Sequence, residues 1–136
     1  MPKVLVIDDD EQFRYYLVTL LERAGYDVFS LQDGSRAQAL LVAEAVDAIV
    51  TDLYMPHTDG IEIVGIVKRH APAVPVIGIS GGGLRPEDPC LKAMKALGAT
   101  VVLTKPLDMA TFLRTLREAL AGSAKPNSSG VTTVPG

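Results

Sequence analysis

The chain is organised around residues 50–60, which read VTDLYMPHTDG. The apolar residues 48–50 predict a buried strand, and Asp52 stands at the end of that strand. Pro56 and Gly60 then bracket a turn, because proline has a fixed φ and glycine accepts positive φ. In an open parallel sheet, ligands bind at the carboxyl ends of the strands. Asp52 is therefore either a turn residue or part of a ligand site, and other stretches of the chain must decide between the two.

Three other polar groups also follow apolar runs. They are Asp8-Asp9-Asp10 after VLVI at 4–7, Ser80 after VIGI at 76–79, and Lys105-Pro106 after VVLT at 101–104. Because the carboxyl ends of parallel strands share one edge, we expect these groups and Asp52 to lie close together. Crowded carboxylates raise one another's pKa values, and a hard divalent cation removes that cost. Since Mg²⁺ prefers oxygen ligands, the acids indicate a magnesium site.

Short apolar runs alternate with helical segments along the chain, which is typical of an α/β fold with a parallel sheet. The predicted strands span residues 3–8, 26–31, 48–52, 74–80 and 100–103, and the predicted helices span about 11–24, 35–45, 59–71, 90–97 and 109–120. Asp10, Ser35 and Asp108 stand where three of these helices begin and are predicted to cap them. Residues 1–121 are predicted to form one domain. Residues 122–136 are predicted to be a disordered tail or the start of a linker.

The composition excludes several classes of protein. A length of 136 residues fits one domain with a real core, and 48% apolar and 21% charged residues are typical of a globular protein. The net charge of −3 argues against direct nucleic-acid binding. The sequence has no run of 18 apolar residues and no signal peptide, so we expect no membrane span. The single cysteine, Cys90, agrees with a cytoplasmic location.

The polar groups at the strand ends, Asp8-Asp9, Asp52, Ser80 and Lys105-Pro106, resemble the receiver domain of two-component response regulators, including the chemotaxis regulators, over about residues 3–121. The resemblance implies a flavodoxin-like three-layer α/β/α sandwich with a five-stranded parallel sheet in the order 2-1-3-4-5. It also implies a signalling domain that takes a phosphoryl group, with Mg²⁺, from a sensor histidine kinase or histidine phosphotransfer protein. The implied downstream partners are an effector or output domain and, in the phosphorylated form, a second copy of the chain.

The resemblance implies a role for each residue of the site. Asp52 matches the phosphoryl acceptor and a metal ligand, and the other ligands match Asp9 and the backbone carbonyl of Tyr54. Asp8 matches the acid that holds a metal-bound water. Two further residues act on the phosphoryl group. Lys105 matches the lysine that binds a phosphoryl oxygen and is expected to pair with Asp52 beforehand, and Ser80 matches the switch hydroxyl. The Lys105–Pro106 peptide is expected to be cis, as is typical of the family.

Three positions depart from the family's pattern. Val102 stands where an aromatic side chain usually reports phosphorylation, and a short β-branched valine cannot replace its movement. Tyr54 stands two residues after the acceptor, where smaller or polar residues are common. Gly81 replaces the usual alanine and opens a glycine-rich loop. We therefore expect phosphorylation to move the loop at 81–89 and the following helix more than any side chain of the last predicted strand.

Two alternatives stay open on the residues alone. The first is an enzyme, a haloacid-dehalogenase-type phosphohydrolase, which would use the Asp-x-Asp pattern of Asp8 and Asp10 with Ser80 and Lys105. Such an enzyme needs a later acidic motif, and it leaves Asp52 unexplained. The second is a non-phosphorylated pseudo-receiver that acts as a binding module. The presence of all five site residues argues against the pseudo-receiver, and Val102 argues for it.

Overall fold

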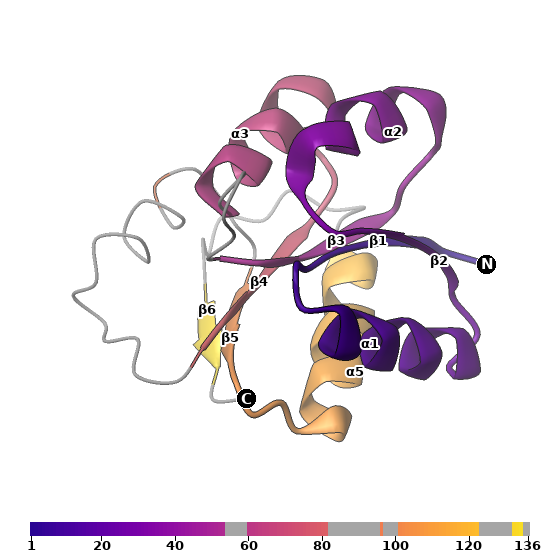
Figure 1. Ribbon diagram of the computed structural model, residues 1–136, viewed down its shortest axis with the longest axis vertical. Coiled ribbons are helices and arrows are strands. Elements are labelled where there is room, and N and C mark those ends of the chain that lie inside the picture. The colour runs from indigo at the N-terminus through magenta and orange to yellow at the C-terminus, as the bar shows by residue number, and fades with distance from the viewer. Residues whose placement is uncertain (54–59, 82–95, 97–100, 123–131, 135–136) are drawn as a thin grey trace.

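Six parallel strands form the sheet in the computed structural model, which describes residues 1–53, 60–81, 96, 101–122 and 132–134 (Figure 1). The order of the strands across the sheet is β2-β1-β3-β4-β5-β6. The strands are β1 Lys3–Ile7, β2 Asp27–Leu31, β3 Ala48–Asp52, β4 Val76–Ser80, β5 Val101–Thr104 and β6 Thr132–Val134. The predicted order 2-1-3-4-5 and the flavodoxin-like fold are confirmed for the first five strands.

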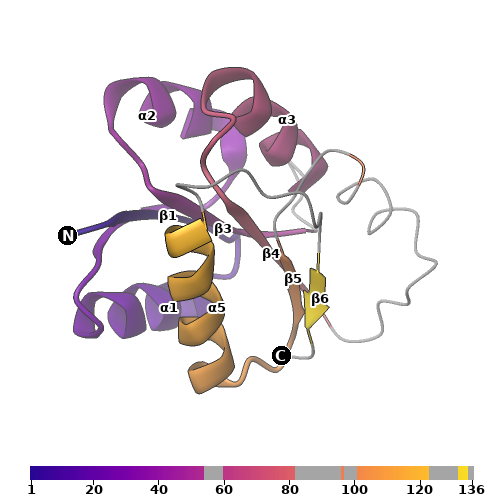
Figure 2. The ribbon, with the colours of Figure 1, turned by 180° about the vertical axis from the view of Figure 1, so that it is seen from behind.

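Helices cover both faces of the sheet and complete the three layers. The helices are α1 Glu11–Arg23, α2 Ala37–Ala43, α3 Gly60–His70 and α5 Met109–Gly122, with a short 3₁₀ turn, η1, at Gly34–Arg36. Figures 1 and 2 show α1 and α5 on one face and α2 and α3 on the other. The helix predicted at 90–97 lies outside the described residues, apart from the helical Ala96. No helix among the described residues is long and apolar enough to cross a lipid bilayer.

The core lies between the sheet and its two helical layers. In β1, Leu5 and Ile7 join the apolar cluster under α2 and α3, whereas Val4 and Val6 join the cluster under α1 and α5. All four side chains are fully buried, which explains why this strand is apolar without alternation. Burial of a side chain of this size contributes about 1.5–3 kcal/mol, so these strands hold the edge that carries the polar groups firmly in place.

The helix starts agree with the sequence at two of three positions. Asp10 caps α1, because its Oδ1 accepts from the backbone N–H groups of Gln12 and Phe13 at 3.1 and 3.2 Å. Asp108 caps α5 by accepting from the backbone N–H of Thr111 at 3.0 Å. The prediction for Ser35 is wrong: Asp33 caps a 3₁₀ turn that precedes α2, because its Oδ1 accepts from the backbone N–H of Ser35, and Arg36 at the start of α2 makes no side-chain capping hydrogen bond. Asp33 can reach that N–H from an extended backbone, whereas Ser35 already lies inside the turn.

The sixth strand differs from the prediction for the end of the chain. A disordered tail or linker was expected from residue 122, whereas α5 ends at Gly122 and residues 132–134 pair with β5. Without β6, β5 would be an edge strand with unpaired backbone groups, and Thr132–Val134 consists of β-branched residues, which favour strands. The rest of the predicted tail lies outside the described residues, and the domain boundary at residue 121 stays a prediction.

Candidate functional site

The predicted site residues meet at the carboxyl edge of the sheet. Asp8 and Asp9 follow β1, Asp52 ends β3, Ser80 ends β4 and Lys105 follows β5. Backbone hydrogen bonds between neighbouring strands continue to this edge. The N–H of Leu53 donates to the carbonyl of Ile79 at 3.0 Å, and the N–H of Lys105 donates to the carbonyl of Ser80 at 2.8 Å. The parallel register therefore brings together residues that lie far apart in the sequence.

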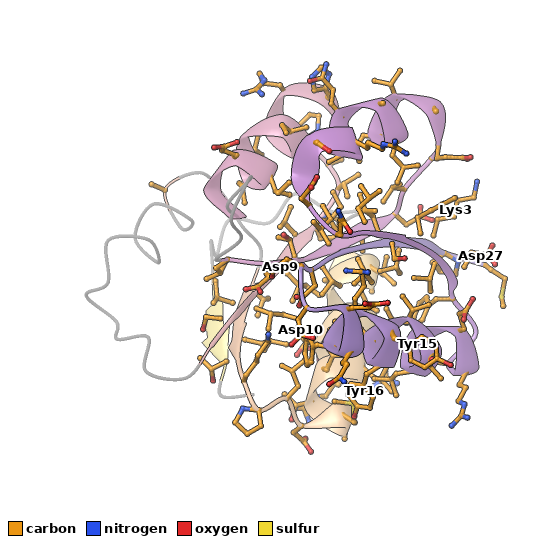
Figure 3. The ribbon with its side chains drawn as sticks, viewed as in Figure 1. Lys3, Asp9, Asp10, Tyr15, Tyr16 and Asp27 are labelled. Carbon is orange, nitrogen blue, oxygen red and sulfur yellow. The ribbon has the colours of Figure 1, made fainter. Side chains whose placement is uncertain are left out.

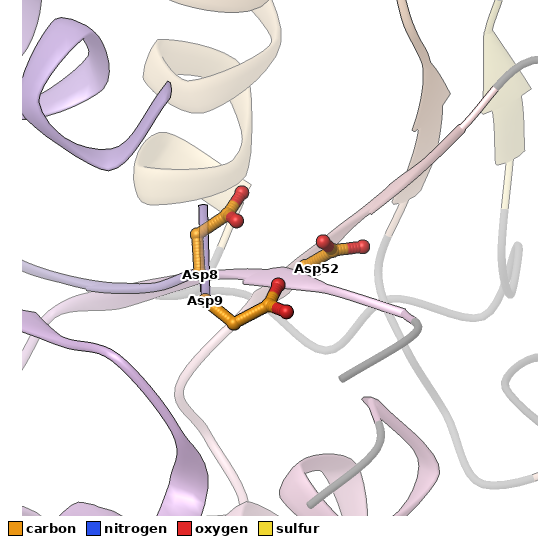
Figure 4. A group of neighbouring side chains, drawn as sticks. All are labelled: Asp8, Asp9 and Asp52. Atoms are coloured by element: carbon orange, nitrogen blue, oxygen red, sulfur yellow. The ribbon is translucent and has the colours of Figure 1, made fainter. Parts of the chain in front are cut away.

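Three carboxylates form the centre of the site (Figure 4). Asp8, Asp9 and Asp52 each offer one oxygen, and these oxygens lie within 4.8 Å of one another. Asp8 is 1% exposed and Asp52 is 8% exposed, while Asp9 is exposed to solvent. Oxygen donors at this spacing, two of them shielded from water, fit a hard divalent cation such as Mg²⁺. Tyr54, whose carbonyl was expected to join them, lies outside the described residues.

The carboxyl group of Asp8 is perturbed by its surroundings. Its pKa is raised from 3.8 to about 6, mainly by burial and also by the nearby charges of Asp52 and Asp9. A hydrogen bond from the backbone N–H of Asp10 to Asp8 Oδ1, at 2.9 Å, and the charge of Lys105 both lower it. A raised pKa means that ionising Asp8 costs free energy in the folded chain. A cation nearby would offset that cost.

Two buried oxygens of the site have hydrogen-bonding capacity that the described residues do not use. Asp8 Oδ2 and Ser80 Oγ are buried and make no hydrogen bond to any described residue. Buried polar groups in folded proteins are almost always hydrogen-bonded, because an unpaired one loses its hydrogen bonds to water and gains none in the protein. Both atoms lie at the edge where a hydrated cation and a phosphoryl group are expected. The orphaned Asp8 Oδ2 fits the predicted role of holding a metal-bound water.

Lys105 brings a positive charge to the acids. Its Nζ lies 3.9 Å from Asp8 Oδ2 and 4.0 Å from Asp52 Oδ2, and its side chain is 27% exposed. The expected ion pair with Asp52 is confirmed, and the ion pair with Asp8 adds to it. Both distances exceed the usual range of a hydrogen bond, so the ammonium acts as a charge shared by two carboxylates. The peptide between Lys105 and Pro106 is cis, as expected.

Two residues of α1 that the sequence analysis did not place in the site contact it. Lys105 Nζ lies 4.2 Å from the centre of the Phe13 ring. The Nη1 of Arg14 donates to the backbone carbonyl of Asp8 at 2.6 Å. Phe13 also packs against the core cluster under α1 and α5. An aromatic residue in the first turn after the acids was the signal that could have pointed to the site.

The residues that depart from the family's pattern are partly described. Val102 is fully buried and belongs to the core cluster under α2 and α3, so it is a packing residue. Gly81 is exposed, and a methyl group added to it would meet no atom of the described residues within 4 Å. The remainder of the loop at 81–89, as well as Cys90, lies outside the described residues.

Comparisons with known proteins agree with this geometry. The sequence model of the response regulator receiver domain family matches residues 4–117 of this chain. Protein PilH of Pseudomonas aeruginosa is 31% identical over 124 residues, which cover 90% of this chain and 100% of PilH. The DNA-binding dual master transcriptional regulator RpaA of Synechocystis sp. is 34% identical over 122 residues, which cover 88% of this chain but 49% of RpaA. The chemotaxis protein CheY4 of Vibrio cholerae has 32% identity and a TM-score of 0.79, with coverage of 88% of this chain and 98% of CheY4.

The family model spans most of the sequence, and PilH is matched along its whole length. The fold, the order of the strands and the acids at their carboxyl ends agree with that match. This chain belongs to the response regulator receiver domain family of two-component signalling.

Proposed function

We propose that Asp52 accepts a phosphoryl group from a sensor histidine kinase or a histidine phosphotransfer protein. The observation that carries the proposal is the cluster of Asp8, Asp9 and Asp52 oxygens within 4.8 Å, with the Lys105 ammonium beside two of them. A carboxylate oxygen of Asp52 attacks the phosphorus of the donor's phosphohistidine. The P–N bond breaks, its electron pair goes to the imidazole nitrogen, and an aspartyl phosphate forms.

The metal ligands of the proposal are Asp9, Asp52 and the backbone carbonyl of Tyr54, with Asp8 bound through a water. Mg²⁺ at this position supplies neutralisation of the negative charge that develops during phosphoryl transfer. Asp9 and Asp52 would hold it directly, because each offers an oxygen in a cluster whose oxygens lie within 4.8 Å of one another. The unused capacity of Asp8 Oδ2 supports the water-mediated contact.

Lys105 and Ser80 act on the phosphoryl group after transfer. The Lys105 ammonium binds a phosphoryl oxygen as a point charge, and it starts 4.0 Å from Asp52 Oδ2. The buried Ser80 hydroxyl has no hydrogen-bond partner among the described residues. In the phosphorylated state it donates to another phosphoryl oxygen, so this hydrogen bond exists in the active state alone. We propose that this contact draws the loop after Ser80 inward, with Val102 remaining in the core.

The partners follow from the same proposal. The phosphorylated surface acts on a downstream effector or output domain, or pairs with a second copy of the chain, and we place this exchange in the cytoplasm. The proposal includes no direct contact with nucleic acid or membrane. The match to the receiver family does not favour the phosphohydrolase alternative, and the pseudo-receiver alternative is decided by the labelling experiment below.

Labelling with acetyl phosphate or phosphoramidate tests the acceptor. With Mg²⁺ present, mass spectrometry should show the addition of a single phosphoryl group, and Asp52→Asn should abolish it. Asp27→Asn is the matched control, because Asp27 is an exposed acid at the start of β2 and should keep full labelling. Labelling that survives Asp52→Asn would sink the assignment, and a wild-type chain that takes no label would indicate a pseudo-receiver.

Metal titration tests the ligands. Mg²⁺ or Mn²⁺ should bind the unphosphorylated chain, and Asp9→Ala should remove the binding, because it deletes one of the two direct carboxylate ligands. Asp10→Ala is the control: Asp10 caps α1, so the variant loses about 1 kcal/mol of stability but keeps its metal affinity. Unchanged titration curves for Asp9→Ala would contradict the ligand set and indicate that Asp8 and Asp10 hold the metal.

A further inference from the structure

We propose that Phe13 is a positioning residue for Lys105, so that the aromatic ring determines where the phosphoryl-binding ammonium lies. The inference rests on the proposed function, because it concerns the lysine assigned there to the phosphoryl group. Lys105 Nζ lies 4.2 Å from the centre of the Phe13 ring. A cation within about 6 Å of a ring centre is attracted by the negative face of the ring.

The ion pairs of Lys105 do not define its position by themselves. Nζ lies 3.9 Å from Asp8 Oδ2 and 4.0 Å from Asp52 Oδ2, which is longer than a hydrogen bond in both cases. A lysine ammonium at the end of a four-carbon stem is a compact charge with little directional preference. Attraction to two carboxylates therefore leaves a range of positions open, and contact with a ring face narrows that range.

The Phe13 ring is itself held in place. Its backbone N–H donates to Asp10 Oδ1 at 3.2 Å, so the cap that begins α1 also sets the position of Phe13. The ring packs against the core cluster under α1 and α5. It also contacts the Tyr16 ring, with 6.3 Å between the ring centres and an interplanar angle of 47°. Figure 3 shows Tyr16 on α1, which Figures 1 and 2 place on the same face of the sheet as α5.

These contacts connect the acidic run to the lysine across the site. Asp8 and Asp9 supply the charges, Asp10 caps the helix that follows, and the first turn of that helix places Phe13 against Lys105. The ring thereby holds the ammonium close to both Asp8 and Asp52 but outside hydrogen-bond distance of either. Removing the ring should let the lysine sample other positions and lower its effectiveness toward a phosphoryl oxygen.

The first test is the chemical shift of the Lys105 side chain. Protons that lie over an aromatic face are shielded, so the Lys105 ε-methylene protons of the wild-type chain should resonate upfield of their ordinary position. Phe13→Leu should return them to that position, whereas Phe13→Tyr and Phe13→Trp should keep the upfield shift. This measurement needs no phosphorylation, so it can succeed or fail independently of the proposed function. Equal Lys105 shifts in the wild-type chain and Phe13→Leu would overturn the inference.

The second test is binding of beryllofluoride with Mg²⁺, together with labelling by acetyl phosphate. Phe13→Leu should weaken beryllofluoride binding and slow labelling by about 2- to 5-fold, the range expected for one cation–π contact. Phe13→Tyr and Phe13→Trp should restore both to within about twofold of the wild type, because each keeps a ring face.

Leu20→Ala is the matched control, because Leu20 also lies on α1 and packs against the same core cluster. It should lower the melting temperature and leave binding and labelling unchanged. Full activity of Phe13→Leu, or an equal loss in Leu20→Ala, would show that the ring serves packing alone and would overturn the inference. Failure of the proposed function itself would look different, because the wild-type chain would then take no label at Asp52.

Discussion

At the residue scale, the negative charge of the buried Asp8 lowers the stability of the metal-free chain. Its carboxyl is 1% exposed, and burial raises its pKa to about 6. One oxygen has a hydrogen bond from the backbone N–H of Asp10, while the other has no hydrogen-bond partner among the described residues. Ionising Asp8 in the metal-free chain is therefore unfavourable. The same property makes the site receptive to a cation, because binding removes the penalty.

We predict that Asp8→Asn stabilises the metal-free chain at neutral pH. Between pH 3.8 and about 6 the folded chain binds more protons at Asp8 than the unfolded chain, so stability falls as pH rises through this window. Above about pH 6 the full free-energy cost of ionising Asp8 applies. This cost is at most about 3 kcal/mol, because a shift of one pKa unit corresponds to about 1.36 kcal/mol. Asn keeps an oxygen for the Asp10 N–H and carries no charge. Urea unfolding in a chelator should therefore show a gain of about 1–3 kcal/mol at pH 8.

The same variant should show no such gain well below pH 3.8, where the Asp8 carboxyl of the wild-type chain is protonated in both the folded and the unfolded state. Asp27→Asn, at an exposed position on β2, should change stability little at either pH. An equal gain for Asp8→Asn at both pH values would mean that packing, and not charge, separates it from the wild-type chain.

At the element scale, β4 and β5 differ in whether their residues can change contacts on phosphorylation. Ser80 ends β4 with a buried hydroxyl that has no hydrogen-bond partner among the described residues. Gly81 follows, and a methyl group there would meet no atom of the described part of the chain within 4 Å. Val102 of β5 is fully buried in the core cluster under α2 and α3. A buried valine has a stiff χ1, whereas Gly81 has no side chain and is exposed. This contrast supports a switch that begins at Ser80.

We predict that activation protects the segment after β4. Amide hydrogen exchange with and without beryllofluoride and Mg²⁺ should show reduced exchange centred on residues 81–97, because Ser80 gains a bond that pulls its loop inward. Ser80→Ala should abolish most of this protection while leaving beryllofluoride bound. Protection confined to Val102 and α5, with residues 81–97 unchanged, would rule out the loop as the switch.

At the scale of the whole molecule, the sheet extends one strand beyond the expected five. β6 pairs with β5 in parallel register, with Val101 opposite Thr132 and Leu103 opposite Val134. In the sequence, α5 lies between β5 and β6. It packs against one face of the sheet. Pairing at this edge satisfies backbone groups of β5 that would otherwise face solvent or another chain.

Deleting residues 123–136 should expose the β5 edge. We expect faster amide exchange at 101–104, a loss of about 1–3 kcal/mol for the lost backbone hydrogen bonds, and more self-association at high concentration. Thr133→Pro is a milder version, since proline removes one backbone donor from β6 and leaves the chain length unchanged. If exchange at 101–104 were the same with and without residues 123–136, β6 would not pair with β5 in solution.

Much of this protein follows from the sequence alone. The first five strands and the acids, hydroxyl and lysine at their ends were predictable, because burial and helical period are local properties of residue type. The order of the strands came from the resemblance to the receiver family. The sequence also identified Asp10 as a cap, since capping depends on a few neighbouring residues. It misplaced the cap at Ser35 because two polar residues compete at that start, and backbone conformation chooses between them.

Tertiary structure decided the rest. The sharing of Lys105 between Asp8 and Asp52, the Phe13 ring against its ammonium, and the pairing of β6 with β5 all join residues from separate elements. No local pattern encodes such distances. They depend on how far α1 is rotated against the sheet and on which edge remains open after five strands have paired, and packing of the whole core sets both.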